Sequence, residues 1–377
     1  TYPHERGAVV MKKPKEVKLQ GKDILSLDFG QHTTKFVLGK VSKSSMTIDR
    51  ALEIPTPFGS VEKGRIIDFE LLKNHFKEFI KNEKIKPAYV ICSVENNEII
   101  TREITLPTTN EDQMDKMLEF EVQQYMPIEM NDYIVQSKII ETFEEDNVKK
   151  TRLLAAAMPK EMARSYFDLL HGVDLNAHVL DLQSNSIDKL LQGGFLINGD
   201  PDFNSKSVAV IDFGYSHINV VMFDKGQYKF NRLITQGSEA IDHNLISFLD
   251  YTKREAEEKK ITLVDISEVY TQEEAHLLML DEETMRIRNI VKNVVDTWIN
   301  EIERIFKFHT TRSTGNAIDK IYIYGGASQM EGLDKYIQDS FNIPTTRIRQ
   351  ITNVTVQNST SKTMMPFVNA LGAMIRR

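Results

Sequence analysis

The sequence predicts an α/β fold with two related lobes, and a repeated pattern is the main reason. Residues 24–38 contain an apolar run, Asp28, a glycine turn and a second apolar run, and residues 208–223 repeat this order around Asp212. Short apolar runs separated by turn residues are typical of buried strands that pair as a hairpin. A further apolar run ends in a glycine pair within residues 321–328. Because open α/β sheets bind ligands where strands end, the ordered turns predict a ligand site shared by both halves.

Both hairpin turns have the composition of a phosphate site. Glycine lets a ligand approach the backbone N–H groups closely, and the neighbouring hydroxyl residues add donors. Asp28 and Asp212 each end the first strand of their hairpin, where a carboxylate suits a hydrated Mg²⁺ that bridges phosphates. A single turn of this kind is common in hairpins for structural reasons alone. The matched pair favours a site in which two turns hold one polyphosphate.

The composition excludes several classes of protein. The 377 residues are 41% apolar and 27% charged, which is ordinary for a soluble globular protein, and the length predicts two or three domains. The net charge of −7 argues against general nucleic-acid binding. Cys92 is the single cysteine, so the chain forms no internal disulfide and is compatible with a reducing compartment. No apolar run approaches the roughly 20 residues of a membrane span, so membrane association would be peripheral or through a partner.

The first half alternates strands with a helix and then changes character. Residues 69–82 have helical periodicity within an α/β layer, and a strand at residues 98–106 is stopped by a proline. Asn110 supplies capping chemistry for a helix at residues 111–126. Two interpretations of its apolar stripe stay open: the core of its own small domain, or a methionine-rich face that also accepts a partner segment. The stripe consists of Met114, Met117, Leu118, Val122, Tyr125 and Met126.

The remaining patterns set the expected domain boundaries. Residues 133–142 and 150–157 predict a strand pair, and residues 159–170 predict a helix that completes a small subdomain. Residues 291–309 predict a long amphipathic helix in the second half. The expected parts are a tail at 1–22 that is disordered or a cloning remnant, a first lobe at 23–96, an inserted subdomain at 97–179, a crossing helix and linker at 180–206, a second lobe at 207–360, and a helix returning to the first lobe at 361–377.

The two hairpins and the glycine pair together resemble the actin, Hsp70 and sugar-kinase superfamily of nucleotide-binding proteins. The resemblance covers nearly the whole chain from Asp23 onward. A closer one lies in the inserted region, where residues 102–107, followed by residues 119–127, resemble the type IV pilus assembly protein PilM family. The insert also relates that family to the division protein FtsA. This implies an actin-like (ribonuclease H-like) α/β fold with two lobes, a central nucleotide cleft and an FtsA-like inserted subdomain.

The same resemblance implies a function. The family acts at the cytoplasmic face of the inner membrane, binds ATP and Mg²⁺, and takes a short apolar N-terminal peptide of the membrane protein PilN near the inserted subdomain. Pilus assembly ATPases and a second copy of the chain are further partners that it leaves open. We expect weak ATPase activity at most, because no residue stands out as a general base and because His32 and Tyr215 are bulky for these turns.

The resemblance also assigns roles to individual residues. Asp28 and Asp212 would hold Mg²⁺ through water. Gln183 would position a water, although a helix cap is an equal interpretation. The local pattern itself, apart from the resemblance, indicates that Gly237 lies in a loop feeding a helix whose N–H groups would be available to an anion. Lys35 would add a charge to the phosphates or point away along its strand. The remaining assignments are Gly30, Thr33, Thr34, Gly214, Tyr215 and Ser216 for the phosphates, Glu257 and Lys260 for the ribose and base, and Gly325, Gly326 and Ala327 for the adenosine.

Other functions are kept as alternatives. An FtsA-like division or filament protein shares the fold and the insert but usually has a C-terminal amphipathic anchor, which residues 374–377 do not suggest. A small-molecule kinase would use the same cleft and would need an acceptor lobe with an aspartate base, for which the sequence offers no convincing candidate. The letters Asp-Phe-Gly alone suggest a protein kinase, which is rejected because no glycine-rich loop or His-Arg-Asp loop accompanies them.

Overall fold

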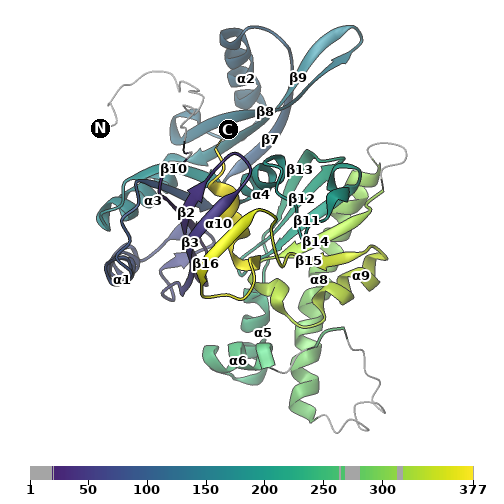
Figure 1. Cartoon of the computed structure of the whole chain (residues 1–377). Coiled ribbons are helices and arrows are strands. Elements are labelled where there is room, and N and C mark those ends of the chain that lie inside the picture. The colour runs from purple at the N-terminus through teal and green to yellow at the C-terminus, as the bar shows by residue number, and fades with distance from the viewer. Residues whose placement is uncertain (1–18, 20, 263–264, 268–280, 312–316, 377) are drawn as a thin grey trace.

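The computed structural model describes residues 19, 21–262, 265–267, 281–311 and 317–376. Within these residues, two large β-sheets lie on either side of a pair of short helices, and a smaller sheet projects beyond the first of them (Figure 1). The strand order is β10-β6-β1-β2-β3-β16 in the first lobe, β13-β12-β11-β14-β15 in the second, and β7-β9-β8 in the projecting sheet.

The elements have the following bounds. The strands are β1 (Ile24–Phe29), β2 (Thr33–Val41), β3 (Met46–Pro55), β4 (Val61–Glu62), β5 (Arg65–Ile66), β6 (Tyr89–Val94), β7 (Ile100–Pro107), β8 (Tyr133–Glu145), β9 (Val148–Pro159), β10 (Ala177–Leu182), β11 (Ser207–Phe213), β12 (Ile218–Asp224), β13 (Gln227–Ile234), β14 (Lys320–Tyr324), β15 (Thr345–Arg347) and β16 (Val354–Ser359). The helices are α1 (Phe69–Asn82), α2 (Glu111–Tyr125), α3 (Lys160–Gly172), α4 (Gln183–Gln192), α5 (Glu239–Leu249), α6 (Lys253–Thr262), α8 (Glu282–Thr311), α9 (Leu333–Phe341) and α10 (Val368–Ala373). None of these described helices is both long enough and apolar enough to cross a membrane.

The same unit is built twice, as the repeated pattern predicts. In the first lobe β1 pairs antiparallel with β2 and parallel with β6, and in the second lobe β11 pairs antiparallel with β12 and parallel with β14. Asp28 lies opposite Ser93 on β6, and Asp212 lies opposite Tyr324 on β14. Both aspartates therefore stand at the carboxyl end of a parallel strand pair, which is where open α/β sheets bind ligands.

Each large sheet is covered on both faces. Helices α1 and α3 pack on the outer face of the first sheet, and α5 and α8 pack on the outer face of the second, where Trp298 is fully buried. The inner faces share one core with α4 and α10. Because both faces of each sheet are covered, every residue of β1 and β11 is buried, and not only alternate ones.

Helices α4 and α10 pack tightly against each other between the lobes (Figure 1). A Cβ added at Gly372 of α10 would lie 2.1 Å from the backbone oxygen of Ser186 on α4, so only glycine allows this approach. The sequence places the expected crossing segments at residues 180–206 and 361–377, and α4 and α10 lie within these ranges.

The projecting subdomain consists of the β7-β9-β8 sheet with α2 packed on it. Leu118, Val122 and Met126 of α2 are buried against this sheet, and Met114 and Met117 pack at the edge of the same core. The methionine stripe is therefore the core of its own subdomain, which was the first of the two interpretations. Its remaining member, Tyr125, is 46% exposed.

Several expected boundaries need correction. Helix α3 was placed in the insert (97–179), yet Tyr166 and Leu169 bury its apolar side in the core of the first lobe, and β10 pairs with β6 of the first sheet. The insert therefore ends with β9. Strand β16 was placed in the second lobe (207–360), yet it pairs with β3 in the first sheet. The expected tail at 1–22 lies largely outside the described residues, and Leu19 is buried in the inner core rather than disordered.

Candidate functional site

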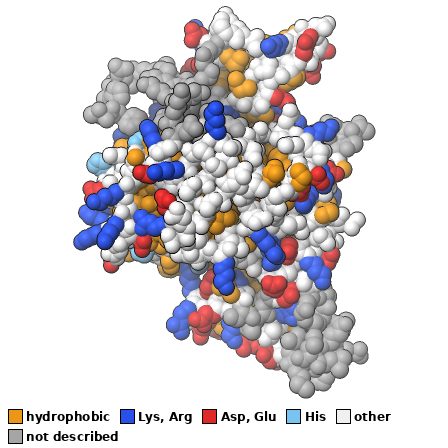
Figure 2. Space-filling view, viewed as in Figure 1, with side chains coloured by type: hydrophobic (Ala, Val, Ile, Leu, Met, Phe, Trp, Pro, Cys, Tyr) orange, Lys and Arg blue, Asp and Glu red, His pale blue; other side chains and the backbone are white. Residues whose placement is uncertain are grey.

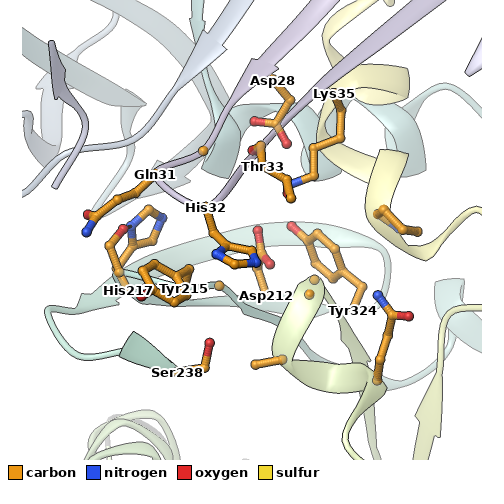
Figure 3. Close-up of a pocket in the computed structure, with 18 of the residues that line it drawn as sticks. Asp28, Gln31, His32, Thr33, Lys35, Asp212, Tyr215, His217, Ser238 and Tyr324 are labelled. Carbon is orange, nitrogen blue, oxygen red and sulfur yellow. Dashed lines mark hydrogen bonds between the residues drawn. The ribbon is translucent and has the colours of Figure 1, made fainter. Parts of the chain in front are cut away.

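A cavity of about 510 Å³ lies between the lobes, and the turns of both hairpins line it. Figure 3 shows Asp28, Thr33 and Lys35 of the first hairpin on one side, with Asp212 and Tyr324 of the second lobe opposite. Thr33 and Lys35 face the cavity because alternate residues of a strand point to the same side. The site therefore forms where the two copies of the repeat approach each other.

Asp28 and Asp212 form the buried floor of this cavity, with 3% and 6% of their surface exposed. Burial raises the pKa of Asp28 above its usual value and raises that of Asp212 to about 6, while Lys35 in the same cavity acts in the opposite direction on both. The Asn369 side-chain amide of α10 donates to Asp212 over 2.8 Å, and the Tyr324 hydroxyl donates to Asn369 over 2.9 Å. Because two buried carboxylates face a single lysine, the site can accommodate the charge of a further cation.

A chain of hydrogen bonds crosses the floor from one lobe to the other. The Gln183 amide nitrogen, at the start of α4, donates to Asp28 over 2.6 Å. The Gln183 amide oxygen lies 3.2 Å from Nε2 of His217, and Nδ1 of His217 lies 3.0 Å from the Ser216 hydroxyl. Burial lowers the pKa of His217 to about 4, so its ring is neutral near pH 7 and donates through Nε2 to the amide oxygen. Both ends of the Gln183 amide are thereby held.

The mouth of the cavity is bridged by side chains from both lobes. The Gln31 amide donates to Glu239 of α5 over 2.7 Å. The ring of His32 stacks on Tyr215 at 4.8 Å between centroids, and its Nε2 lies 3.6 Å from a carboxylate oxygen of Glu257. Desolvation lowers the pKa of His32, although Glu257 opposes this. The two bulky turn residues thus contact each other across the cleft.

The far side of the cavity combines charged residues of α6 with the glycine pair after β14. Lys260 lies 2.6 Å from a carboxylate oxygen of Asp242 and 2.8 Å from one of Glu257, so its charge is shared by two acids. Gly325 has a φ of +88°, and a Cβ there would lie 2.1 Å from Asp212 Oδ1. Only glycine fits this turn, and it leaves the backbone open toward the cavity.

Glu95 adds a buried carboxylate that sequence reasoning did not single out. It follows directly after β6, lines the cavity and is 6% exposed. Burial raises its pKa to about 7, although hydrogen bonds from Ser184 act in the opposite direction. The backbone N–H of Ser184, in the first turn of α4, donates to its Oε2 over 3.2 Å.

The structure brings together most of the residues expected at the site. Those that line the cavity are Asp28, Gly30, Thr33, Lys35, Gln183, Asp212, Gly214, Tyr215, Ser216, Glu257, Lys260, Gly325, Gly326 and Ala327. Thr34 does not, because strand alternation turns it away, and its hydroxyl lies 2.9 Å from that of Thr56 in the interior. Gly237 does not either, because the N–H groups of Ser238 and Glu239 that follow it donate to backbone oxygens of the second turn instead of facing an anion.

Sequence patterns could have identified some of the other residues that line the site, but not all of them. Glu95 follows a strand that runs parallel to β1, and this position could have marked it. His217 directly precedes the second strand of the repeated hairpin. Gln31 lies in the turn itself, whereas Asn369 is an ordinary polar residue in an apolar helix and no local pattern distinguishes it.

A family model described as "Type IV pilus assembly protein PilM" matches residues 26–374. The chain belongs to the type IV pilus assembly protein PilM family. Among solved structures, this PilM-family chain is similar to a chain of a "PilM-PilN type IV pilus biogenesis complex", with a TM-score of 0.78, 19% identity, and 93% of this chain and 97% of that chain covered. It is also similar to the ethanolamine utilization protein EutJ of Carboxydothermus hydrogenoformans, with a TM-score of 0.53, 11% identity, and 98% and 94% covered. At such identities the likeness establishes the fold, which is the expected actin-like α/β fold.

In this member of the PilM family, the buried state of Glu95 makes stability depend on pH. The pKa of Glu95 in the folded protein is about 7, above the usual 4.5. The contribution of protonated Glu95 to the free energy of unfolding is therefore fully present below about pH 4.5 and is lost as the pH rises through about 7. Glu95→Gln removes the charge and keeps an acceptor for Ser184. We expect its melting temperature to exceed that of the parent by roughly 3–6 °C at about pH 8 and to match it near pH 4.5.

The control is Glu98→Gln in the same loop. Glu98 is ion-paired with Arg65, whose hydrogen bond lowers the pKa of that carboxylate, so the substitution should give no gain at about pH 8. Equal melting temperatures for Glu95→Gln and the parent protein at both pH values would contradict the buried charge.

Proposed function

We propose that this protein is an ATP-binding scaffold of the type IV pilus inner-membrane assembly complex, and that it binds the N-terminal cytoplasmic peptide of PilN. The observation that carries the nucleotide part is the facing pair of hairpin turns, each with a buried aspartate at the end of its first strand. A polyphosphate between these turns would accept hydrogen bonds from backbone N–H groups of both lobes. Its binding would therefore favour the closed arrangement of the lobes.

Mg²⁺ fits the chemistry of the cavity floor. Asp28 and Asp212 supply hard carboxylate oxygens from the two lobes. Burial raises the pKa values of both, because it makes their negative charges costly in free energy. A divalent cation would offset that cost and would screen the phosphates from both carboxylates. When bound, it would supply charge neutralisation of the polyphosphate, while Lys35 adds a point charge from the first hairpin.

The remaining cavity residues orient the ligand. Gly325, Gly326 and Ala327 would let an adenosine lie against the backbone, and Glu257 and Lys260 stand where they could contact its ribose or base. Gln183 would hold a water, because its amide is fixed by Asp28 and His217. The stacked His32 and Tyr215 limit access to the phosphates, which supports slow turnover rather than rapid hydrolysis.

The projecting subdomain is the proposed site for the partner peptide. Figure 2 shows hydrophobic side chains on the surface of this subdomain, at the top of the view. Among its described residues, the large apolar side chains of Phe120 and Ile139 are 64% and 55% exposed and so are available to a partner. Arg102 holds Tyr125 in place, because its guanidinium lies 5.4 Å from the ring centroid and donates to the backbone carbonyl oxygen of Tyr125. The solved complex of a similar chain with PilN supports PilN as the partner.

This partner also defines the proposed location. The chain would lie on the cytoplasmic side of the inner membrane and would be held there through PilN.

The nucleotide site is tested by removing one floor carboxylate at a time. Asp28→Asn and Asp212→Asn should each weaken Mg-ATP binding by about tenfold or more, because each loses a charge that the hydrated cation would contact. Isothermal titration calorimetry on the full chain measures the affinity, with circular dichroism to confirm folding. Asp339→Asn on the exposed surface of α9 is the matched control and should bind like the parent. Parent-like affinity in both floor variants would exclude this assignment.

The peptide site is tested by charge insertion at an exposed aromatic residue. Phe120→Glu should weaken binding of a synthetic PilN N-terminal peptide about tenfold or more, because the peptide would have to cover an unpaired carboxylate. Mg-ATP affinity should stay unchanged. Phe248→Glu on α5 of the second lobe is the control, since Phe248 is equally prominent at 71% exposed. If both variants bind the peptide as the parent does, the peptide lies elsewhere.

A further inference from the structure

The sequence shows no committed base for hydrolysis, whereas the structure places a buried carboxylate beside the proposed nucleotide site. We propose, resting on the function proposed above, that Glu95 is the catalytic base of a slow ATP hydrolysis in this cleft. It would accept the proton of the water that attacks the γ-phosphate.

The position of Glu95 in the repeat is the first argument. Strand β6 stands beside β1 as β14 stands beside β11, and Ser93 and Tyr324 are the partners of the two aspartates. Two residues farther along, the first lobe has Glu95 where the second lobe has Gly326. The second lobe therefore offers an open backbone for the adenosine, and the first lobe offers a carboxylate at the matching strand end, across the phosphate turns.

Glu95 is held rigidly by its surroundings. The Asn96 side chain donates to the backbone oxygen of Lys63 over 2.6 Å, and the Lys63 N–H donates to the side-chain oxygen of Gln31 in the first turn over 2.8 Å. On its other side Glu95 accepts from the backbone of Ser184, the residue after Gln183. The Glu95 carboxylate is thus bonded to the residue that follows Gln183, and its neighbour Asn96 is linked through Lys63 to the first phosphate turn. Such a fixed position is the preorganisation that a general base requires.

The protonation chemistry agrees with this role. Burial brings the pKa of Glu95 to about 7, close to the ambient pH, and the charge of Asp212 contributes to this rise. The charge of Glu95 in turn raises the pKa values of Tyr228 and Tyr324. His217 is a poor base by comparison, because its pKa is lowered to about 4. A base works best with a pKa near the working pH.

The water oxygen forms a bond to the γ-phosphorus, and the bond from that phosphorus to the β,γ-bridging oxygen breaks, with its electron pair leaving on ADP. One water proton passes to the Glu95 carboxylate. Glu95 then releases this proton to solvent when inorganic phosphate departs, so ATP and water give ADP, phosphate and a proton.

Capping of α4 is the competing role, since Glu95 accepts from the first turn of that helix. Glu95→Gln separates the two roles, because the amide oxygen still accepts from Ser184 but cannot take a proton. The general-base role predicts a loss in kcat of about 10²-fold for Glu95→Gln, with Mg-ATP affinity within about threefold of the parent. The rise of kcat/KM with pH through about 7, which reports the base in the free protein, should disappear, and Glu95→Asp should keep part of the activity and that rise.

A measurement that does not depend on turnover accompanies the kinetics. Phosphates bound near Glu95 should raise its pKa further, so binding of Mg-AMPPNP near pH 7 should take up protons. Calorimetry in two buffers of different ionisation enthalpy measures this uptake, which should fall in Glu95→Gln and persist in the Glu98→Gln control.

The outcomes are distinct. Unchanged kcat, pH profile and proton uptake in Glu95→Gln would overturn the proposal and leave Glu95 as a helix cap. Binding of Mg-ATP without any turnover in the parent would also overturn it, while the proposed scaffold function would stand. Absence of Mg-ATP binding in the parent would overturn the nucleotide function itself, and the base with it.

Discussion

Asp28 and Asp212, the two carboxylates of the cavity floor, are each held by a side-chain amide from one of the two crossing helices. Gln183 of α4 donates to Asp28, and Asn369 of α10 donates to Asp212. A neutral amide satisfies a carboxylate oxygen without cancelling its charge, so both negative charges stay available to a cation. The helices that join the lobes therefore also set the orientation of the site.

The close packing of α4 on α10 makes this arrangement stiff. Gly372 brings the α10 backbone against that of Ser186, and the shared inner core extends from these helices into both sheets. A displacement of either lobe would have to change the bonds at Gln183 or Asn369. Binding of a cation at the floor and the relative position of the lobes are thus physically connected. The ion pair between Lys138 on β8 and Asp188 on α4, at 2.7 Å, extends this connection to the projecting subdomain.

The sequence predicted what depends on local patterns. The repeated apolar runs with Asp28 and Asp212 specified both hairpins, because buried strands and glycine turns have strong local preferences. The assignment of Thr34 to the phosphates was wrong, because Thr34 points into the interior. Alternate residues of a strand point to opposite sides, and the sequence alone does not show which side faces the cavity. Helix α3 was misplaced because an amphipathic pattern shows that a helix has a buried side but not which sheet covers it. Glu95 could have been identified from its position at the end of a predicted strand. Asn369 depends on contacts between distant segments, and no local pattern indicates it.

The most direct test of the account is a crystal structure of the full chain grown with Mg-AMPPNP. The account predicts the polyphosphate between the turns at residues 30–33 and 214–216, with Mg²⁺ linked through water to Asp28 and Asp212. It also predicts the adenosine against Gly325 and Gly326. A nucleotide bound outside this cavity, or a cavity without nucleotide at saturating concentration, would contradict the central claim that the two hairpins form one nucleotide site.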